Sequence, residues 1–241
     1  MIGGVIIDGG GPKKVVVRAI GPSLAAAGVS AALNDPVLQL YNASGEVIAE
    51  NDDWSESADR QAITDANLAP THSRESAISA SLPAGNYTAV VRGAGDTSGV
   101  GLVEVYDLAP SAGRLANIAT RAQVQTGDRV LIGGFIIGGD APARILVRGI
   151  GPSLRQGIPP VIGALADPVL DLRDSDGNLM ATNDNWQQSA QRQQIEASGI
   201  APTDPAESAI VATLVPANYT AVVRGAKDST GVALVEVYKL D

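Results

Sequence analysis

Two acidic stretches of the sequence contain residue types that bind hard cations. In each, an Asp is followed by a run of Asn and Asp and then, further on, by a Glu. The residues of the two stretches are Asp35, Asn51, Asp52, Asp53 and Glu75, and then Asp167, Asn183, Asp184, Asn185 and Glu207. Calcium takes about six to eight oxygen ligands from carboxylates, amides and backbone carbonyls. Because the pattern occurs twice, the sequence predicts a calcium site in each stretch.

The same residues have a second interpretation that involves no metal. Asp and Asn side chains also form turns with their own backbone and cap helix N-termini. In both stretches the Asn-Asp run stands directly before a tryptophan, Trp54 or Trp186, and a short stretch suited to a helix. Calcium binding and turn chemistry therefore both remain open at this stage.

Catalytic patterns are scarce in the sequence. His72 is the sole histidine, and its counterpart in the second half of the chain is Asp204. The sequence contains no G-x-S-x-G, no phosphate-binding loop and no histidine cluster for a transition metal. Asp52 and Asp53 are adjacent and should point apart, whereas glycosidase chemistry needs two carboxyl groups that face one cleft. We therefore predict that the protein is not an enzyme.

Charge and composition narrow the possible partners. With 17 basic and 26 acidic residues, the net charge is −9, which argues against nucleic acid and against an anionic membrane surface. No apolar run approaches the roughly 20 residues that span a bilayer. The absence of cysteine removes disulfides and thiol chemistry. The first residues contain no basic segment or cleavage site, so we expect no export signal in this chain.

The chain consists of two copies of one unit. Residues 75–108 match residues 207–240 at 24 of 34 positions without a gap, which establishes a duplication. The matches continue upstream from Asp35 and Asp167, and from Gly3 and Gly133. We expect a first domain over 1–108, a small-residue linker over 109–113 and a second domain over 114–241.

Alternating apolar residues and turn signals predict an all-β fold. Many short strands at this spacing are typical of β-sandwiches, so we expect two tandem antiparallel, jelly-roll-like sandwiches, each with one short helix. The expected strands are 2–7, 14–20, 37–42, 46–50, 77–82, 86–92 and 100–107, then 115–124, 130–137, 144–150, 169–173, 178–182, 209–214, 218–224 and 232–239. The expected helices are 56–67 and 188–198. We expect turns at 20–24 and 150–154, and hairpin tips at 42–45, 174–177, 95–99 and 227–231.

Several side chains have expected structural roles. The two tryptophans should anchor the short helices rather than form a sugar-binding surface. Arg18 and Arg148 lie in apolar strands, and such strand charges usually have a cross-strand partner. The carboxylates of Glu104 and Glu236 are the expected partners.

At these motifs the chain resembles known bacterial repeats. The order DPxLxLxxxxGxxxAxND, ESAIxAxL, NYTAVVRG and GVxLVEVY resembles the pre-peptidase C-terminal type of β-sandwich, which is appended to secreted enzymes and found in other exported proteins. With NIATRxxVxTGDxVLIGGFII and VRAIGPSL, it resembles more closely a repeat of long secreted or surface proteins of environmental bacteria. The resemblance implies an extracellular or cell-surface location and a non-catalytic module.

The resemblance also bears on calcium, because some domains of the pre-peptidase type bind it. The residues that it would involve are Asp35, Asp52, Asp53 and Glu75, with Asp167, Asp184 and Glu207. Asn185 replaces Asp53 in the second copy, so the second site should be weaker.

One feature distinguishes the two copies and predicts how the protein is used. The second copy begins with an additional strand near 115–124, which has no counterpart before Gly3. A sandwich without this strand has an open edge that invites a strand from elsewhere. We expect the first copy to borrow residues 115–124 or a segment of another chain, which would produce a filament if subunits exchange strands. The residues predicted for assembly are Leu115, Ala116, Asn117, Ile118, Ala119 and Thr120.

These observations predict a structural or adhesive extracellular protein. Its partners would be other copies of itself or neighbouring repeats, with calcium as the one expected cofactor. The alternative is a carbohydrate- or peptide-binding accessory module of a secreted enzyme. That module would need an aromatic platform, and the chain has only one Phe, two Trp and five Tyr to build it.

Overall fold

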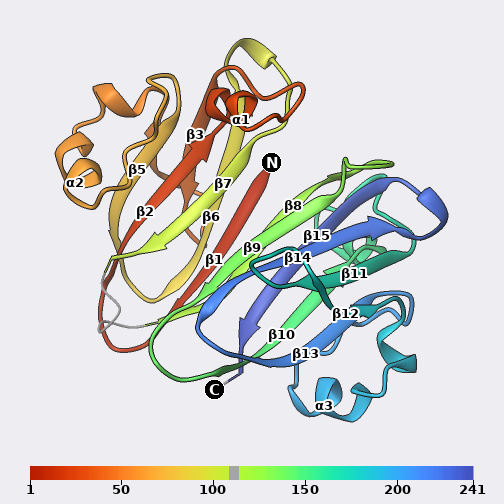
Figure 1. The fold of residues 1–241 in the computed structure, drawn as a ribbon. Helices are drawn as coiled ribbons and strands as arrows, with labels where there is room; N and C mark the ends of the chain where they lie inside the picture. The colour runs from red at the N-terminus through yellow and green to blue at the C-terminus, as the bar shows by residue number, and fades with distance from the viewer. Residues whose placement is uncertain (109–113, 241) are drawn as a thin grey trace. The chain divides into compact units, whose positions relative to one another are not determined.

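The computed structural model describes residues 1–108 and 114–240, which divide into two compact units, Met1–Ala116 and Asn117–Asp241. The linker expected at 109–113 lies outside the described residues. Each strand expected from alternation corresponds to a strand of the structure, with ends that differ by no more than one or two residues. The all-β sandwich is therefore confirmed (Figure 1).

Unit 2 is an eight-stranded sandwich of two antiparallel sheets. One sheet has the order β8-β15-β10-β13 and the other β9-β14-β11-β12. When the eight strands are numbered from one to eight along unit 2, the first sheet has the order 1-8-3-6 and the second 2-7-4-5. This is the order of a jelly roll. The strands are β8 (Arg114–Val124), β9 (Leu131–Ile137), β10 (Ala143–Ile150), β11 (Pro168–Arg173), β12 (Leu179–Asn183), β13 (Ser208–Leu214), β14 (Ala217–Gly225) and β15 (Gly231–Lys239).

Unit 1 repeats this order with one strand fewer. Its sheets are β5-β2-β7 and β1-β6-β3-β4, again antiparallel throughout. The position that β8 holds beside β15 has no counterpart beside β7 among the strands of unit 1. The strands are β1 (Ile2–Asp8), β2 (Lys13–Ile20), β3 (Pro36–Tyr41), β4 (Val47–Asn51), β5 (Ser76–Leu82), β6 (Gly85–Gly93) and β7 (Leu102–Asp107).

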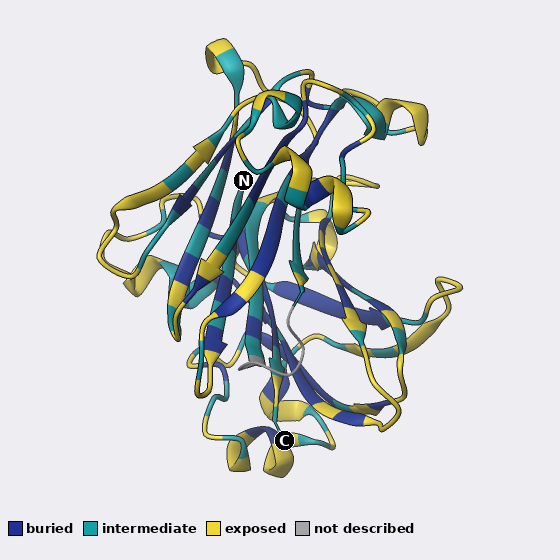
Figure 2. Cartoon of the chain, turned by 90° about the vertical axis from the view of Figure 1, so that its left-hand side faces the viewer, coloured by how far each residue is buried: buried dark blue, intermediate teal, exposed yellow. Residues whose placement is uncertain are grey.

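Branched aliphatic side chains fill the space between the sheets. In unit 2 the buried cluster joins Leu131, Val147, Leu170, Val223 and Val235, with the one phenylalanine stacked on Tyr219. Alternate residues of each strand contribute to this cluster, because successive side chains point to opposite faces of a sheet. The strands are accordingly striped with buried and more exposed residues, while most turns are exposed (Figure 2).

The expected helices are present as short caps over one sheet of each unit. In unit 1, α2 (Arg60–Asp65) follows a 3₁₀ turn at Trp54–Glu56 and packs on β5; in unit 2, α3 (Arg192–Ala197) follows Trp186–Gln188 and packs on β13. Trp186 is 6% exposed and packs against Ile195 of α3, and Trp54 packs beside Ile63 of α2. The tryptophans are thus anchors of the caps, as predicted.

Two sequence-based expectations about connections are wrong. Residues 95–99 and 227–231 are not hairpin tips, because β6 and β7, like β14 and β15, belong to different sheets. The strand that follows each turn therefore crosses to the other layer. At 20–24 and 150–154 the chain does more than turn, since Pro22–Ala26 forms helix α1 and Pro152–Gln156 forms a 3₁₀ helix. The hairpins at 42–45 and 174–177 are confirmed.

Within the part of the chain that the structure describes, no helix has the length and apolar character needed to span a bilayer.

Candidate functional site

The open edge of β7 is the main structural difference between the two units. In unit 2, β15 pairs with β10 on one side and with β8 on the other. In unit 1, β7 pairs with β2 alone among the described strands. An unpaired strand edge presents a row of backbone donors and acceptors to another chain. We therefore consider this edge the candidate interaction site.

The backbone groups at this edge can be assigned from the hydrogen bonds that flank β7. The amide of Leu108 donates to the carbonyl of Lys14, and that of Val100 donates to Ala31, so the even-numbered residues point toward the β2 side. Alternation along an antiparallel ladder then directs the N–H and C=O groups of Val103 and Val105 to the open side. Val103 and Val105 thus each offer both an N–H donor and a C=O acceptor to a further strand.

Side-chain exposure shows that a layer of core is missing at the same edge. In unit 2, Val235 is 2% exposed and Val237 is 8% exposed, since Ile118 and Ala122 of β8 pack against their cluster. Their counterparts, Val103 and Val105, are only partly buried. On the opposite, outer face Leu102 at the start of the strand is 41% exposed, and Val100, just before it, is 45% exposed. The edge of β7 therefore combines open backbone with incompletely covered apolar side chains.

The residues predicted for assembly all lie in β8. Asn117–Thr120 pair with β15, and Ile118 stands opposite Val237. Leu115 and Ala116 belong to the same strand and precede the residues of β8 that pair with β15. Among the described pairings, β8 lies beside β15 and β7 pairs with β2 alone. That the first copy borrows residues 115–124 or a segment of another chain stays a prediction.

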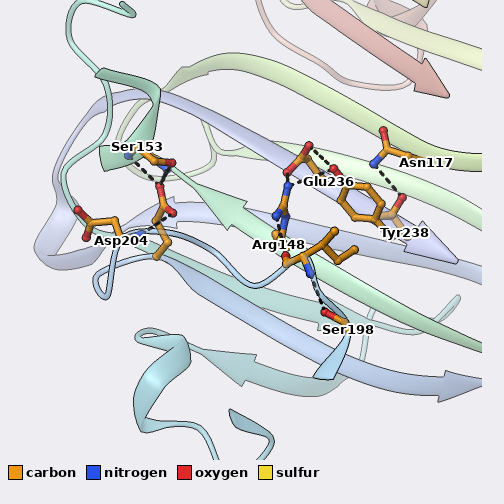
Figure 3. A network of polar contacts seen from close by, with 11 residues as sticks. Asn117, Arg148, Ser153, Ser198, Asp204, Glu236 and Tyr238 are labelled. Carbon is orange, nitrogen blue, oxygen red and sulfur yellow. Dashed lines mark hydrogen bonds and ion pairs between the residues drawn. The ribbon is translucent and has the colours of Figure 1, made fainter. Parts of the chain in front are cut away.

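Glu75 and Glu207, which the sequence grouped with the calcium ligands, are fully buried and have another role. One carboxylate oxygen of Glu207 accepts hydrogen bonds from the amides of Gly151 and Ser153 at 3.1 and 2.9 Å and from the Ser153 hydroxyl at 2.6 Å. The other accepts from the amide of Asp204 at 3.4 Å (Figure 3). This carboxylate closes the turn that follows β10, and its oxygens face backbone donors rather than the acidic run.

Glu75 makes the same contacts in unit 1. It accepts from the amides of Gly21 and Ser23, from the Ser23 hydroxyl and from the amide of His72. Sequence reasoning missed this role. The signal that could have found it is the joint repetition of Ile-Gly-Pro-Ser-Leu and Glu-Ser-Ala-Ile in both copies.

The two asparagines that begin the acidic runs are also committed to structure. The side-chain oxygen of Asn51 accepts from the amide of Ala77 at 2.8 Å, and its NH₂ group donates to the carbonyl of Asp53 at 3.1 Å. Asn183 makes equivalent bonds to Ala209 and Asn185. These side-chain amides join the end of β4 or β12 to β5 or β13. The expected helix caps are not formed, because Asp53 and Asn185, which precede the two 3₁₀ helices, make no capping hydrogen bond through their side chains.

The remaining acidic side chains lie close enough to repel one another. The pKa of Asp52 is raised, first by partial loss of hydration and then by the carboxylates of Asp35, Asp53, Glu50 and Glu56. In unit 2 burial and the charge of Asp184 raise the pKa of Asp167, while Lys227 opposes them. Position 95, which corresponds to Lys227, is a glycine in unit 1. The acidic run of unit 1 therefore lacks the nearby positive charge that the run of unit 2 has.

Two carboxylate oxygens in these runs, Oδ1 of Asp53 and Oδ1 of Asp167, are buried without a hydrogen-bond partner. Among the described residues, no three acidic, His or Cys side chains surround a common point suited to a metal ion. These contacts give the calcium prediction no support. What remains to be tested is the acidic run of unit 1, with Asp35, Asp52 and Asp53, since the Asn and Glu side chains first expected as ligands bind the backbone.

This narrower calcium prediction has a direct test. Adding Ca²⁺ should raise the melting temperature of unit 1, because an ion bound only by the folded state stabilises it by mass action. Asp52→Asn should raise the melting temperature without metal, since it removes a repelled charge, and should abolish the response to Ca²⁺. Asp184→Asn, at the equivalent position of unit 2, is the matched control, because Lys227 there opposes the effect of Asp184 on the pKa of Asp167. An unchanged melting temperature of the unsubstituted chain would contradict calcium binding.

Arg148 is the centre of a second polar network in unit 2. Its Nε donates to Glu236 at 3.0 Å, Nη1 donates to the carbonyl of Ile200 at 2.6 Å, and Nη2 contacts Glu236 and the Tyr238 hydroxyl. The guanidinium also lies 4.9 Å from the centre of the Tyr238 ring (Figure 3). Arg18 repeats these contacts with Glu104, Leu68 and Tyr106. The predicted cross-strand Arg–Glu pairs are confirmed.

This network makes the stability of unit 2 sensitive to alkaline pH. Burial, followed by the charge of Glu236, raises the pKa of Tyr238 to about 12. In the unfolded chain the Tyr238 hydroxyl loses its proton near pH 10. The stabilisation that protonated Tyr238 gives to the folded state is therefore complete below about pH 10 and is lost as the pH rises to about 12. We expect the free energy of unfolding of unit 2 to fall by about 2 kcal/mol over this range.

Urea unfolding at several pH values, with tyrosinate absorbance followed in parallel, measures this effect. Tyr238→Phe should remove this part of the pH dependence. If the variant and the original chain lose stability equally, the assignment to Tyr238 is wrong.

His72, the residue on which an enzymatic role would depend, takes part in a local turn. Its Nδ1 accepts from the amide of Arg74 at 3.2 Å, and its carbonyl accepts from the indole of Trp54 at 3.1 Å. In unit 2 the carbonyl of Asp204 accepts from Trp186 in the same way. The side chain of Asp204 also accepts from the amide two residues later, that of Ala206 at 2.9 Å, as the His72 ring does from Arg74. Both roles that the two units share at this position are thus structural.

Comparison with known proteins gives little further guidance. No protein family matches the chain, and no curated protein matches it. Among solved structures, it is similar to PBCV-1 VP54 fitted into a reconstruction of the virophage Sputnik, with 9% identity and a TM-score of 0.22, over 99% of this chain and 93% of that one. It is also similar to the VP2 subviral particle of infectious bursal disease virus, with 12% identity and a TM-score of 0.19, over 97% and 58% of the two chains. Such slight similarities carry no argument about function.

Proposed function

We propose that this chain is a non-catalytic structural and adhesive module that acts outside the cell and joins other polypeptides through the open edge of β7. The observation that carries the proposal is the contrast between β7, paired on one side, and β15, paired on both. The extracellular location rests on the resemblance to secreted bacterial repeats. Its partners are other copies of itself or neighbouring repeats.

The use of the buried polar groups supports a structural role. The carboxylate of Glu207 is occupied by backbone amides and a serine hydroxyl, and the guanidinium of Arg148 by Glu236, Tyr238 and a backbone carbonyl. Both networks recur in unit 1 with the same partners. The polar residues that the duplication retains are therefore those that hold the sandwich together.

The alternative of an accessory binding module divides into two parts. A carbohydrate site built on the tryptophans is poorly supported, because Trp186 is buried and the indole N–H groups of both tryptophans donate to backbone carbonyls. A peptide site would use the same β7 edge as the structural role. The two functions then differ in whether the chain also associates with itself.

Sedimentation over a wide range of protein concentration tests the structural role. We expect association that increases with concentration, since an open edge is a template for another strand. Val105→Pro should abolish it, because proline removes a donor that faces the open side while the bonds to β2 remain. Replacing the exposed Val47 of the β4 edge by proline is the matched control and should leave association intact. A chain that stays monomeric at every concentration would contradict the proposal.

A further inference from the structure

We infer that the edge of β7 takes an antiparallel strand of the β8 type, supplied by a neighbouring repeat, in the register that β8 adopts on β15. This inference rests on the proposed function and identifies the partner of the same edge. The duplication supports this inference, since β8 occupies the equivalent position beside β15 in unit 2. Each residue of β7 has a counterpart on β15 whose opposite residue in β8 is known.

The register follows from this correspondence. Val235 stands opposite Thr120 and Val237 opposite Ile118, so Val103 and Val105 should receive the equivalents of Thr120 and Ile118. Both valines direct their backbone groups to the open side, as derived above. The incoming strand would therefore complete the ladder and cover the two partly buried valines together.

The size of one incoming side chain is constrained by the network beside it. Ala119 stands opposite Glu236, beside the Arg148 network. Because unit 1 repeats this network at Glu104, a small residue is required opposite Glu104 as well. The partner strand thus needs a small residue between the equivalents of Ile118 and Thr120, as in the Ile-Ala-Thr of β8, rather than any extended peptide.

The source of the strand follows from counting strand edges. β8 of this chain is already paired with β15. If a second copy donated its β8 to β7, its own β15 would lose a partner, so the number of open edges would not change. A β8-type strand that is not committed to its own repeat closes the edge without opening another. We therefore assign the partner as such a strand of a neighbouring repeat, and exchange between copies as the competing outcome.

Disulfide trapping with a synthetic peptide tests the register. The chain has no cysteine, so Leu102→Cys creates a single thiol on the exposed face of β7. Its counterpart Leu234 stands opposite Arg121. By the alternation derived above, this is a non-hydrogen-bonded pair, whose close Cα spacing permits a disulfide. The probe is a peptide of residues 115–124 that carries Arg121→Cys.

We expect this peptide to form the mixed disulfide about tenfold faster than control peptides, because pairing raises the local thiol concentration. One control peptide carries Thr120→Cys, which places the thiol on the opposite face, and the other carries Gln123→Cys, which is displaced along the strand. Two chain controls are Leu234→Cys, whose edge is covered by β8, and Leu102→Cys combined with Val105→Pro. Both should react at the slow rate of the control peptides.

The outcomes separate this inference from the proposed function. Equal rates for all three peptides would overturn the inference, and the structural role would stand if the chain still associates through β7. Disulfide-linked dimers of a chain carrying both Leu102→Cys and Arg121→Cys would overturn the assignment to a neighbouring repeat and establish exchange between copies. If the chain traps the Arg121→Cys peptide specifically but never associates with itself, the inferred partner strand and its register would stand. The proposed structural role would then be replaced by peptide binding.

Discussion

Replacing Glu207 by alanine is expected to destabilise unit 2 by about 3 to 5 kcal/mol. The side chain is fully buried, and its carboxylate accepts four hydrogen bonds, three of them from backbone amides. Alanine would leave the amide of Gly151 buried, and those of Ser153 and Asp204 partly buried, without this acceptor, and each orphaned donor then carries a desolvation penalty. Hydrogen bonds to a charged acceptor are also stronger than those between neutral groups.

Urea unfolding followed by tryptophan fluorescence measures this loss unit by unit. In a Trp54→Phe background the signal comes from Trp186, which packs in unit 2. Glu207→Gln retains an acceptor and should lose less stability than Glu207→Ala. Glu196→Ala is the control, because Glu196 pairs with Arg192 on the exposed face of α3 and such pairs contribute about 0.5 kcal/mol or less. Similar losses for Glu207→Ala and Glu196→Ala would contradict the role assigned to Glu207.

The second large effect is a contrast between equivalent positions of the two units. Val237→Pro should destabilise unit 2 by about 2 to 4 kcal/mol, because it removes a backbone donor to β8 within a continuous sheet. Val105→Pro should destabilise unit 1 by less than about 1 kcal/mol, since proline is tolerated where the N–H of an edge strand faces solvent. The two substitutions change the same residue type at the same place in the fold, so their difference isolates the strand pairing.

The measurement uses the same fluorescence, with Trp186→Phe as the background for unit 1 and Trp54→Phe for unit 2. An equal loss of stability in both units would mean that β7 is paired on both sides. That result would remove the basis of the proposed interaction site.

The strands could be predicted from the sequence because their apolar residues alternate and because each pattern occurs twice. The positions of the expected strands 14–20 and 144–150, for example, differ from β2 and β10 by one residue at the start. The connections could not be predicted in the same way. Residues 95–99 have the composition of a hairpin tip, yet β6 and β7 lie in different sheets, and alternation alone does not say which sheet a strand joins.

The candidate site was predicted in part. The repeat comparison predicted that the first copy has no counterpart of residues 115–124, but it did not say which strand would then form an edge. That β7 pairs with β2 alone among the described strands came from the structure. The calcium ligands were harder to derive, because an Asp, Asn or Glu at a turn has the same appearance in a sequence whether it binds a cation or the backbone. Asn51 and Glu75 bind the backbone, and only their partners in the folded chain, Ala77 and the turn at Gly21, show it.

Amide hydrogen exchange tests the central claim, that unit 1 is a jelly roll with an open β7 edge, most directly. It compares Val103 and Val105 with Val235 and Val237 in one sample, at a concentration where the chain is monomeric. We expect the amides of Val103 and Val105 to exchange at least about 100-fold faster, since amides hydrogen-bonded within a sheet exchange only when the bond opens, whereas those at a free edge already contact water. Equal protection of the two pairs of valines would contradict the central claim.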